Sequence, residues 1–350
     1  MGRGLCKWCK NLKSAVEKSL SENNVDTNKY GIEVTEKGVT IGWKQTADKK
    51  VIKGDKVIEI GDVVNYHDAA NDNKTENYTG GWQVLGVENG KIKLLSTVNV
   101  GDTIDVYDAI FDKSYAMRYF TIVNELNEKG KIYGTGKGAS YARSINVEDV
   151  DSLTGYDKNT YGTGTINEYG STVTYYWDNT SGKESNPYYE STNGTNGNLT
   201  DTHAKFNYCL NNQIIENTKP SSISNKQKIT SITNTYYSYK LNDTGLLSGT
   251  ANEKAYNLLY WNENKYEDGY WLASTYVNTY SSRVVWGLHS ICGDSLNSNL
   301  IDPGDIVYSN SNYSNSGGAF SVYTNYLRVV VVLDSNVTLT GSSSAGWNIS

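Results

Sequence analysis

Cysteine and long apolar runs are scarce in this chain, as is proline, and the first two scarcities each exclude a class of protein. Its 350 residues include 3 Pro and 4 Cys. The four cysteines, at positions 6, 9, 209 and 292, are too few for a disulfide scaffold of this length. No stretch approaches the roughly 18 apolar residues of a membrane helix. Residues 1–13 are basic but lack the apolar segment of a signal peptide. We therefore expect no membrane span, and no signal peptide is visible.

Basic residues are also too few and too scattered for a nucleic-acid-binding protein. The chain has 32 Lys and Arg against 38 Asp and Glu, which gives a net charge of −6. Because a nucleic-acid surface needs a basic patch, we expect no nucleic-acid partner. The length is sufficient to bury a sizeable core.

Tyrosine is abundant, with 29 Tyr against 8 Trp and 4 Phe. Residues 275–282 and 290–326 combine Tyr with Asn, Ser, Thr, Gly and Asp. Antibody loops use the same combination, because Tyr gives rigid contact area and small polar residues give adaptable hydrogen bonds. An AT-rich coding bias also enriches Asn, Lys and Tyr, but it does not explain why they concentrate here. Since apolar segments 270–274 and 326–333 bracket the stretch, we expect a polar binding surface on a rigid frame.

Local patterns predict a mixed α+β fold. Apolar residues four apart predict a short helix over 12–22, and a one-sided stripe predicts another over 113–129. Asn146 is the expected N-cap of a further helix. Alternating segments predict strand hairpins that turn at residues 36–38, 53–55 and 89–90. This order of elements is typical of α+β folds rather than of repeating βαβ units.

We divide the chain into an N-terminal arm, residues 1–60, with a short helix and hairpins, and a main domain, residues 61–350. Within the main domain, residues 155–255 are polar and weakly periodic. So long an irregular segment is uncommon in a compact domain unless a scaffold holds it or it forms a binding surface.

No short motif supports catalysis or metal binding. Cys6 and Cys9 have the spacing of half a zinc site, but zinc needs four ligands and no second pair follows. The glycines of residues 134–138 lack the Ser or Thr that follows Lys in a phosphate-binding loop. Three isolated histidines share no motif with a nucleophile, namely His67, His203 and His289. We predict no catalytic residue, no metal and no cofactor.

Other reactive side chains have structural interpretations. The adjacent carboxylates Glu148-Asp149 and Glu267-Asp268 are typical of solvated turns and helix starts. Cys209 and Cys292 are interpreted as packing residues, because single cysteines usually behave as small apolar groups. Arg328 lies within an apolar strand, and we favour an internal pairing that holds strand ends together over contact with a ligand.

The apolar segments also carry a family resemblance. Residues 270–274 are Tyr-Trp-Leu-Ala-Ser, residues 286–288 are Trp-Gly-Leu, and residues 327–333 are Leu-Arg-Val-Val-Val-Val-Leu. This layout resembles the C-type-lectin-fold domains of the formylglycine-generating-enzyme-like superfamily. An uncharacterised bacterial and phage branch of it is similar over the wider pattern of residues 61–66, 81–85 and 142–150. The resemblance covers roughly residues 60–350. The family pattern usually has Pro at the position of Val329. Because Val has a backbone N–H and Pro does not, this position regains a hydrogen-bond donor.

The resemblance implies a C-type lectin-like fold with short twisted antiparallel strands, two helices and long irregular loops. Some members of the superfamily are the variable proteins of diversity-generating retroelements, in which adenine-directed mutagenesis changes AAY codons of a C-terminal cassette. Such changes produce Asn, Ser, Thr, Asp, Tyr, His, Ile, Gly and Cys, which fill residues 276–326 here. The expected variable region is 270–333. The enzymes of the superfamily use cysteines near the end of the domain, and Cys209 and Cys292 do not recreate that pair.

We therefore predict a non-catalytic ligand-binding protein, a receptor-binding protein or adhesin, whose partner is a protein or glycan on a target cell surface. A cell surface or a virion is the favoured location, and the oligomeric state stays open. The expected frame residues are Trp271, Trp286, Leu327, Arg328 and Leu333. The expected contact residues are Tyr276, Asn278, Tyr280, His289, Asp294, Asn297, Asn299, Tyr308, Asn310, Asn312, Tyr313, Tyr323 and Asn325.

Three alternatives stay open. A fixed-specificity carbohydrate-binding lectin of the calcium type would need carboxylates and Asn clustered around one pocket. A structural subunit of a pilus or virion would self-associate through residues 1–60. A formylglycine-generating-type oxidase would need Cys209 and Cys292 within reach of each other.

Overall fold

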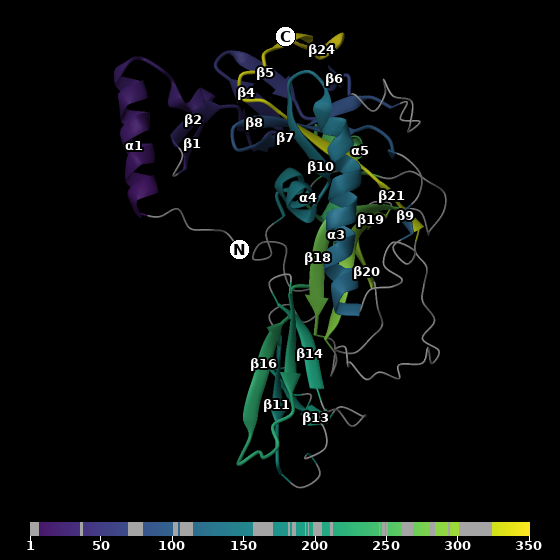
Figure 1. Cartoon of the computed structure of the whole chain (residues 1–350). Coiled ribbons are helices and arrows are strands. Elements are labelled where there is room, and N and C mark those ends of the chain that lie inside the picture. The colour runs from purple at the N-terminus through teal and green to yellow at the C-terminus, as the bar shows by residue number, and fades with distance from the viewer. Residues whose placement is uncertain are drawn as a thin grey trace.

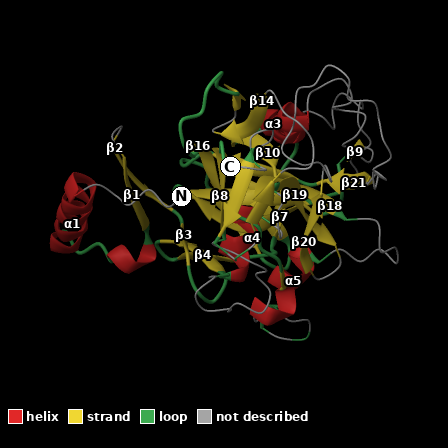
Figure 2. Cartoon of the chain, turned by 90° about the horizontal axis from the view of Figure 1, so that it is seen from below, coloured by secondary structure: helices red, strands yellow, loops and turns green. Residues whose placement is uncertain are grey.

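The computed structural model of the chain is shown in Figure 1 and, turned by 90°, in Figure 2. Within some strands and near the start of two helices it describes the backbone alone. The described residues are 7–35, 38–68, 80–100, 104–105, 115–156, 171–180, 183, 187–192, 194, 196–198, 205–210, 213–244, 246, 249, 251–260, 269–279, 284–292, 295–300 and 324–350.

The fold is α+β, as expected, but the described residues contain four helices rather than the two expected for a lectin-like fold. The predicted helices are confirmed as α1 (Lys7–Glu22), α3 (Tyr115–Lys131) and α4 (Val147–Thr154). The sequence does not predict α5 (Glu253–Leu259), because seven residues are too few to show a helical period. None of these helices is long and apolar enough to cross a bilayer.

A seven-stranded sheet forms the upper part of the molecule in Figure 1, with the strand order β10-β22-β8-β7-β6-β24-β23. β7 and β8 form the hairpin predicted at Asn89-Gly90, whose φ angles of 52° and 73° fit a primed two-residue turn. β24 pairs in parallel with β6, so the two ends of the main domain meet. The strands are β6 (Val63–Asn65), β7 (Trp82–Glu88), β8 (Lys91–Ser96), β10 (Ala139–Ser144), β22 (Val329–Leu333), β23 (Leu339–Ser342) and β24 (Gly346–Ile349).

A six-stranded sheet shares the main core with the first sheet, in the order β17-β20-β19-β18-β21-β9. Arg328 alone separates β21 from β22, so the chain passes there from one sheet to the other. α3 packs along β10 and β18. The strands are β9 (Ile104–Asp105), β17 (Tyr239–Lys240), β18 (Tyr270–Asn278), β19 (Val285–Cys292), β20 (Ser295–Leu300) and β21 (Thr324–Leu327).

Residues 172–233 build a small second unit, so the expectation of irregular chain throughout 155–255 is wrong in this part. Its core contains Val173, Tyr175, Trp177 and Phe206. The strands escape prediction because Thr and Tyr occupy both faces, which weakens the apolar alternation. The sheet is β13-β12-β11-β16, beside the hairpin β14–β15. Their bounds are β11 (Thr172–Trp177), β12 (Tyr188–Ser191), β13 (Asn196–Asn198), β14 (Lys205–Leu210), β15 (Gln213–Thr218) and β16 (Gln227–Thr233).

The N-terminal arm is shorter than expected. α1 and the hairpin of β1 (Gly31–Thr35) and β2 (Gly38–Gly42) lie at one edge of the molecule in both views. A three-stranded sheet follows, in which Val51 and Ile58 belong to the main core. The packed domain therefore includes residues well before the boundary expected at residue 60. The strands of this sheet are β3 (Lys44–Gln45), β4 (Lys50–Lys53) and β5 (Lys56–Glu59).

Candidate binding surface

The predicted contact stretch is carried by consecutive strands of the six-stranded sheet. β18 pairs antiparallel with β19, and β19 pairs antiparallel with β20. At one end of this sheet Asn278 lies opposite Val285 and Leu300 lies opposite Gly287. The chain therefore leaves β18 after Asn278 and β20 after Leu300 at the same end of the sheet.

Four of the predicted frame residues are confirmed as buried. Trp271, Leu327, Arg328 and Leu333 are at most 3% exposed. Trp286 lies in β19, and its side chain is outside the described part of the chain.

Arg328 has the structural role expected of it. Its Nε donates to Ser96 O at 3.0 Å, its Nη1 donates to Leu258 O at 2.6 Å, and its Nη2 also donates to Ser96 O. The guanidinium carbon lies 5.1 Å from the centroid of the Tyr270 ring. The backbone donor restored at Val329 is used as well, because its N–H donates to Ser96 Oγ at 3.1 Å. Arg328 thus ties the crossing between the two sheets to β8 and α5.

Tyr276 and His289 are buried, so the expectation that they lie on an exposed contact face is wrong. Each is 1% exposed. Their ring centroids are 5.1 Å apart, and Tyr236 and Tyr237 lie 5.2 Å from Tyr276 and His289 respectively. The backbone N–H of Tyr236 donates to Val277 O at 3.0 Å. This bond holds residues 236–239, the tyrosine segment, against the end of β18.

The other predicted contact residues divide into two groups. Asn278 lies in β18, Asn297 and Asn299 in β20 and Asn325 in β21, and the structure describes their backbone. The remaining seven positions lie outside the described residues, namely Tyr280, Asp294, Tyr308, Asn310, Asn312, Tyr313 and Tyr323.

Asp151, which the sequence analysis does not single out, holds the same tyrosine segment. Tyr237 OH donates to its Oδ2 at 2.5 Å and Tyr239 OH donates to its Oδ1 at 2.7 Å. Tyr156 stacks on Tyr239 with ring centroids 4.2 Å apart. Burial raises the pKa of Asp151 to about 6, although both hydroxyl hydrogen bonds act to lower it. No local pattern reveals this site, because the two tyrosines lie 86 and 88 residues further along the chain.

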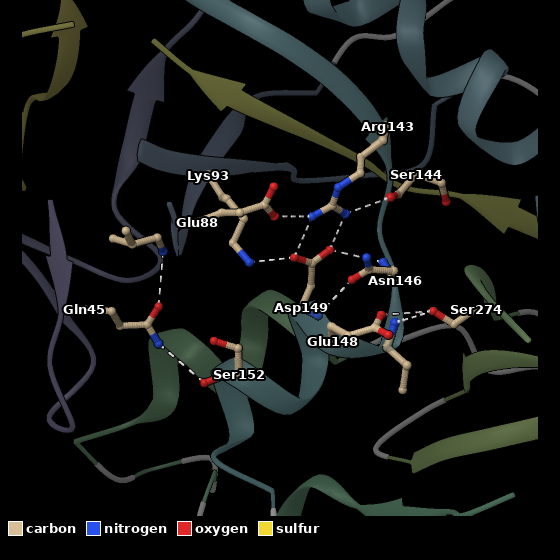
Figure 3. Close-up of polar contacts among 12 residues, drawn as sticks. Gln45, Glu88, Lys93, Arg143, Ser144, Asn146, Glu148, Asp149, Ser152 and Ser274 are labelled. Atoms are coloured by element: carbon tan, nitrogen blue, oxygen red, sulfur yellow. Dashed lines mark hydrogen bonds and ion pairs between the residues drawn. The ribbon is translucent and has the colours of Figure 1, made fainter. Parts of the chain in front are cut away.

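The first turn of α4 lies in a buried ion network, drawn in Figure 3. The side chains of Asn146 and Asp149 cap each other's backbone N–H, as a capping box. Asp149 Oδ1 accepts from Lys93 Nζ at 2.6 Å, and Oδ2 accepts from Arg143 Nη1 at 2.6 Å. Burial opposes ionisation, but Arg143 and Lys93 hold the pKa of Asp149 below its ordinary value. The helix start is confirmed, whereas Asp149 is buried rather than solvated.

Ser274, the last residue of the Tyr-Trp-Leu-Ala-Ser motif, joins β18 to this helix. Its Oγ accepts from the backbone N–H of Val147 at 2.9 Å. That N–H belongs to the first helical residue and has no partner within the helix. The Ser of the motif therefore satisfies a backbone donor and orients α4 on the sheet.

A pocket of about 680 Å³ lies at the other end of α4. Lys49 Nζ donates there to Leu153 O at 2.6 Å, and burial lowers the pKa of Lys49. Gln45 Nε2 donates to Ser152 O at 3.4 Å. None of the predicted contact residues lines this pocket, whose walls are formed by Gln45, Thr46, Ala47, Lys49, Val87, Ser152, Thr154, Gly155, Thr244 and Asn252.

The glycine-rich segment 134–138 has a packing role. A Cβ at Gly136 would lie 2.1 Å from His67 O, and its N–H donates to Tyr66 OH at 3.0 Å. In the described part of the chain, no group of three or more His, Cys, Asp or Glu side chains is placed to hold a metal ion. Cys209 and Cys292 lie in strands of different sheets, and their side chains are not described.

Searches with the chain matched no family model, no curated protein and no solved structure. The resemblance to C-type-lectin-fold domains therefore stays a prediction from the motifs.

Proposed function

We propose that the chain is a non-catalytic ligand-binding protein that presents a Tyr-, Asn- and Ser-rich variable surface on a C-type lectin-like scaffold. It acts as a receptor-binding protein or adhesin at a cell surface or on a virion. Its partner is a protein or glycan of a target cell, and retroelement mutagenesis of the C-terminal cassette supplies the variation.

The main support is the buried frame within residues 270–350. Trp271, Leu327 and Leu333 are buried in the main core, and Arg328 is bonded to backbone carbonyls. The polar segments start from strands that this frame holds in register. A surface can change its side chains without unfolding the domain only if the fold depends on other residues, and the buried frame supplies such residues.

Three interior carboxylates of the described residues support binding rather than catalysis, because internal partners occupy them. Asp62 Oδ2 accepts from Trp347 Nε1 at 2.9 Å, and Asp62 Oδ1 accepts from Ser343 Oγ at 2.6 Å. Arg143 binds Asp149. The hydroxyl groups of Tyr237 and Tyr239 bind Asp151. These contacts join strands and helices to one another, whereas a general acid or base must reach a substrate.

Randomising the contact positions tests this proposal without knowledge of the ligand. One displayed library varies Asn278, Asn297, Asn299 and Asn325 together with the seven undescribed contact positions. Because the proposal places these side chains outside the core, we expect most variants to stay resistant to protease. Panels of immobilised proteins and glycans should then select different binders from this library.

Two matched libraries act as controls. One varies the frame residues Trp271, Leu327 and Leu333, and the other varies the buried pair Tyr276 and His289. We expect fewer than about one in ten variants of either control to resist protease, since core substitutions commonly cost several kcal/mol. If the contact library loses resistance as often as the frame library, the proposed surface is part of the core and the proposal fails.

A further inference from the structure

Exposed apolar side chains occur on both α1 and β2 of the N-terminal arm. Ile32 pairs with Ile41 and Val34 with Val39, so these four β-branched residues share one face of the hairpin. α1 packs on β1, and Val34 is only 4% exposed. On the neighbouring strand Val39 and Ile41 are 39% and 41% exposed, and Trp8 at the start of α1 is 58% exposed. The helix therefore covers only part of the apolar face.

The charges of α1 are divided along its length. Lys7, Lys10 and Lys13 lie in its first half, and Glu17 and Glu22 lie in its second half, with Lys18 between them. The first turn has no acidic residue and the last turn has no basic residue. Since the N-terminal end of a helix carries a positive partial charge, this order is unfavourable for the helix dipole. Lys13 and Lys18 form exposed pairs with Glu17 and Glu22 within the helix, which offset only part of this cost.

The same order is favourable in an antiparallel pair of identical helices. The lysine-rich half of each helix then lies beside the glutamate-bearing half of the other, and opposite ends of the two helix dipoles are adjacent. A second copy of this chain is therefore the partner whose charge pattern complements α1.

We propose that the arm is a homodimer interface, in which α1 of a second copy packs antiparallel to α1 and covers Trp8, Val39 and Ile41. A twofold axis between the two helices brings the same surface residues of both subunits into contact with each other. Figures 1 and 2 show α1 at the edge of the molecule, with β1 and β2 between it and the rest of the chain. Pairing joins two binding domains in one particle, which raises the avidity for a surface that carries many ligands.

Complementary charge variants of the full chain test the pairing. Lys10→Glu/Lys13→Glu makes α1 mainly acidic, and Glu17→Lys/Glu22→Lys makes it basic. Sedimentation equilibrium should show a dimeric parent, with self-association of each variant at least about tenfold weaker. An equimolar mixture of the two variants should recover the parental affinity, because unlike helices then meet. A monomeric parent, variants that dimerise like the parent, or a mixture that stays monomeric overturns the proposal.

The apolar part of the interface has its own variant. Val39→Thr/Ile41→Thr keeps β-branching in β2 and should also give a monomer that retains the parental far-ultraviolet circular dichroism. The matched control is Val57→Thr in β5, where the side chain is 48% exposed and lies outside α1, β1 and β2. This control should stay dimeric, and its dissociation to the same extent as the β2 variant would contradict the assigned surface.

Discussion

Asp149→Ala is expected to lower the free energy of unfolding by about 3–5 kcal/mol, a large share of the stability of an ordinary domain. Lys93 is 5% exposed, and the change leaves it and Arg143 without the carboxylate that binds both of them. It also removes one half of the capping box of α4. Urea unfolding monitored by tryptophan fluorescence measures the loss.

The control for this substitution is Asp48→Ala. Asp48 pairs with Lys50 at 2.7 Å, but its side chain is 62% exposed. Because exposed ion pairs contribute little, the urea midpoint of this variant should match that of the parent. Equal stability of the Asp149 and Asp48 variants would mean that the buried network does not stabilise the fold.

The second large effect is a dependence of stability on pH that originates at Asp151. The pKa of this group is about 6 in the folded state, against an ordinary value of 3.8. Because the folded-state value is the higher one, the contribution to stability is fully present below about pH 4 and is lost as the pH rises towards about 6. The two values differ by an amount that corresponds to about 3 kcal/mol.

Asp151→Asn isolates this contribution, because the amide can accept a hydrogen bond from one tyrosine and donate to the other. Between about pH 3 and pH 7, the parent should lose about 3 kcal/mol of unfolding free energy relative to the variant. The measurement is a set of urea titrations across this range. Parallel curves for the two proteins would contradict a titration of Asp151 in this window.

The features that sequence predicts well are those determined by neighbouring residues. Asn89-Gly90 produces its hairpin because both residues accept a positive φ, and Asn146 begins α4 because its side chain reaches Asp149 N. The frame residues Trp271 and Leu327 lie in short apolar runs that indicate burial. In each case the cause lies within a few positions of the residue.

The features that sequence does not predict depend on distant parts of the chain. Tyr276 and His289 are covered by tyrosines some forty to fifty residues earlier in the sequence. No periodicity within β18 or β19 indicates that these two side chains are buried. Lys93 and Asp149 form their ion pair across 56 positions. In β11 of the second unit, Tyr lies on both faces, as Tyr175 and Tyr176 show, so the burial of alternate residues appears only in the structure.

The central claim is that residues 270–350 combine an invariant frame with a variable contact surface, and deep sequencing of the coding region across a natural population tests it most directly. The account predicts a near-identical template repeat nearby and substitutions at template adenines, concentrated in codons 276–326. Codons for Trp271, Leu327, Arg328 and Leu333 should stay unchanged. A uniform cassette without a repeat, or substitutions that are equally frequent in the frame codons, would contradict the account.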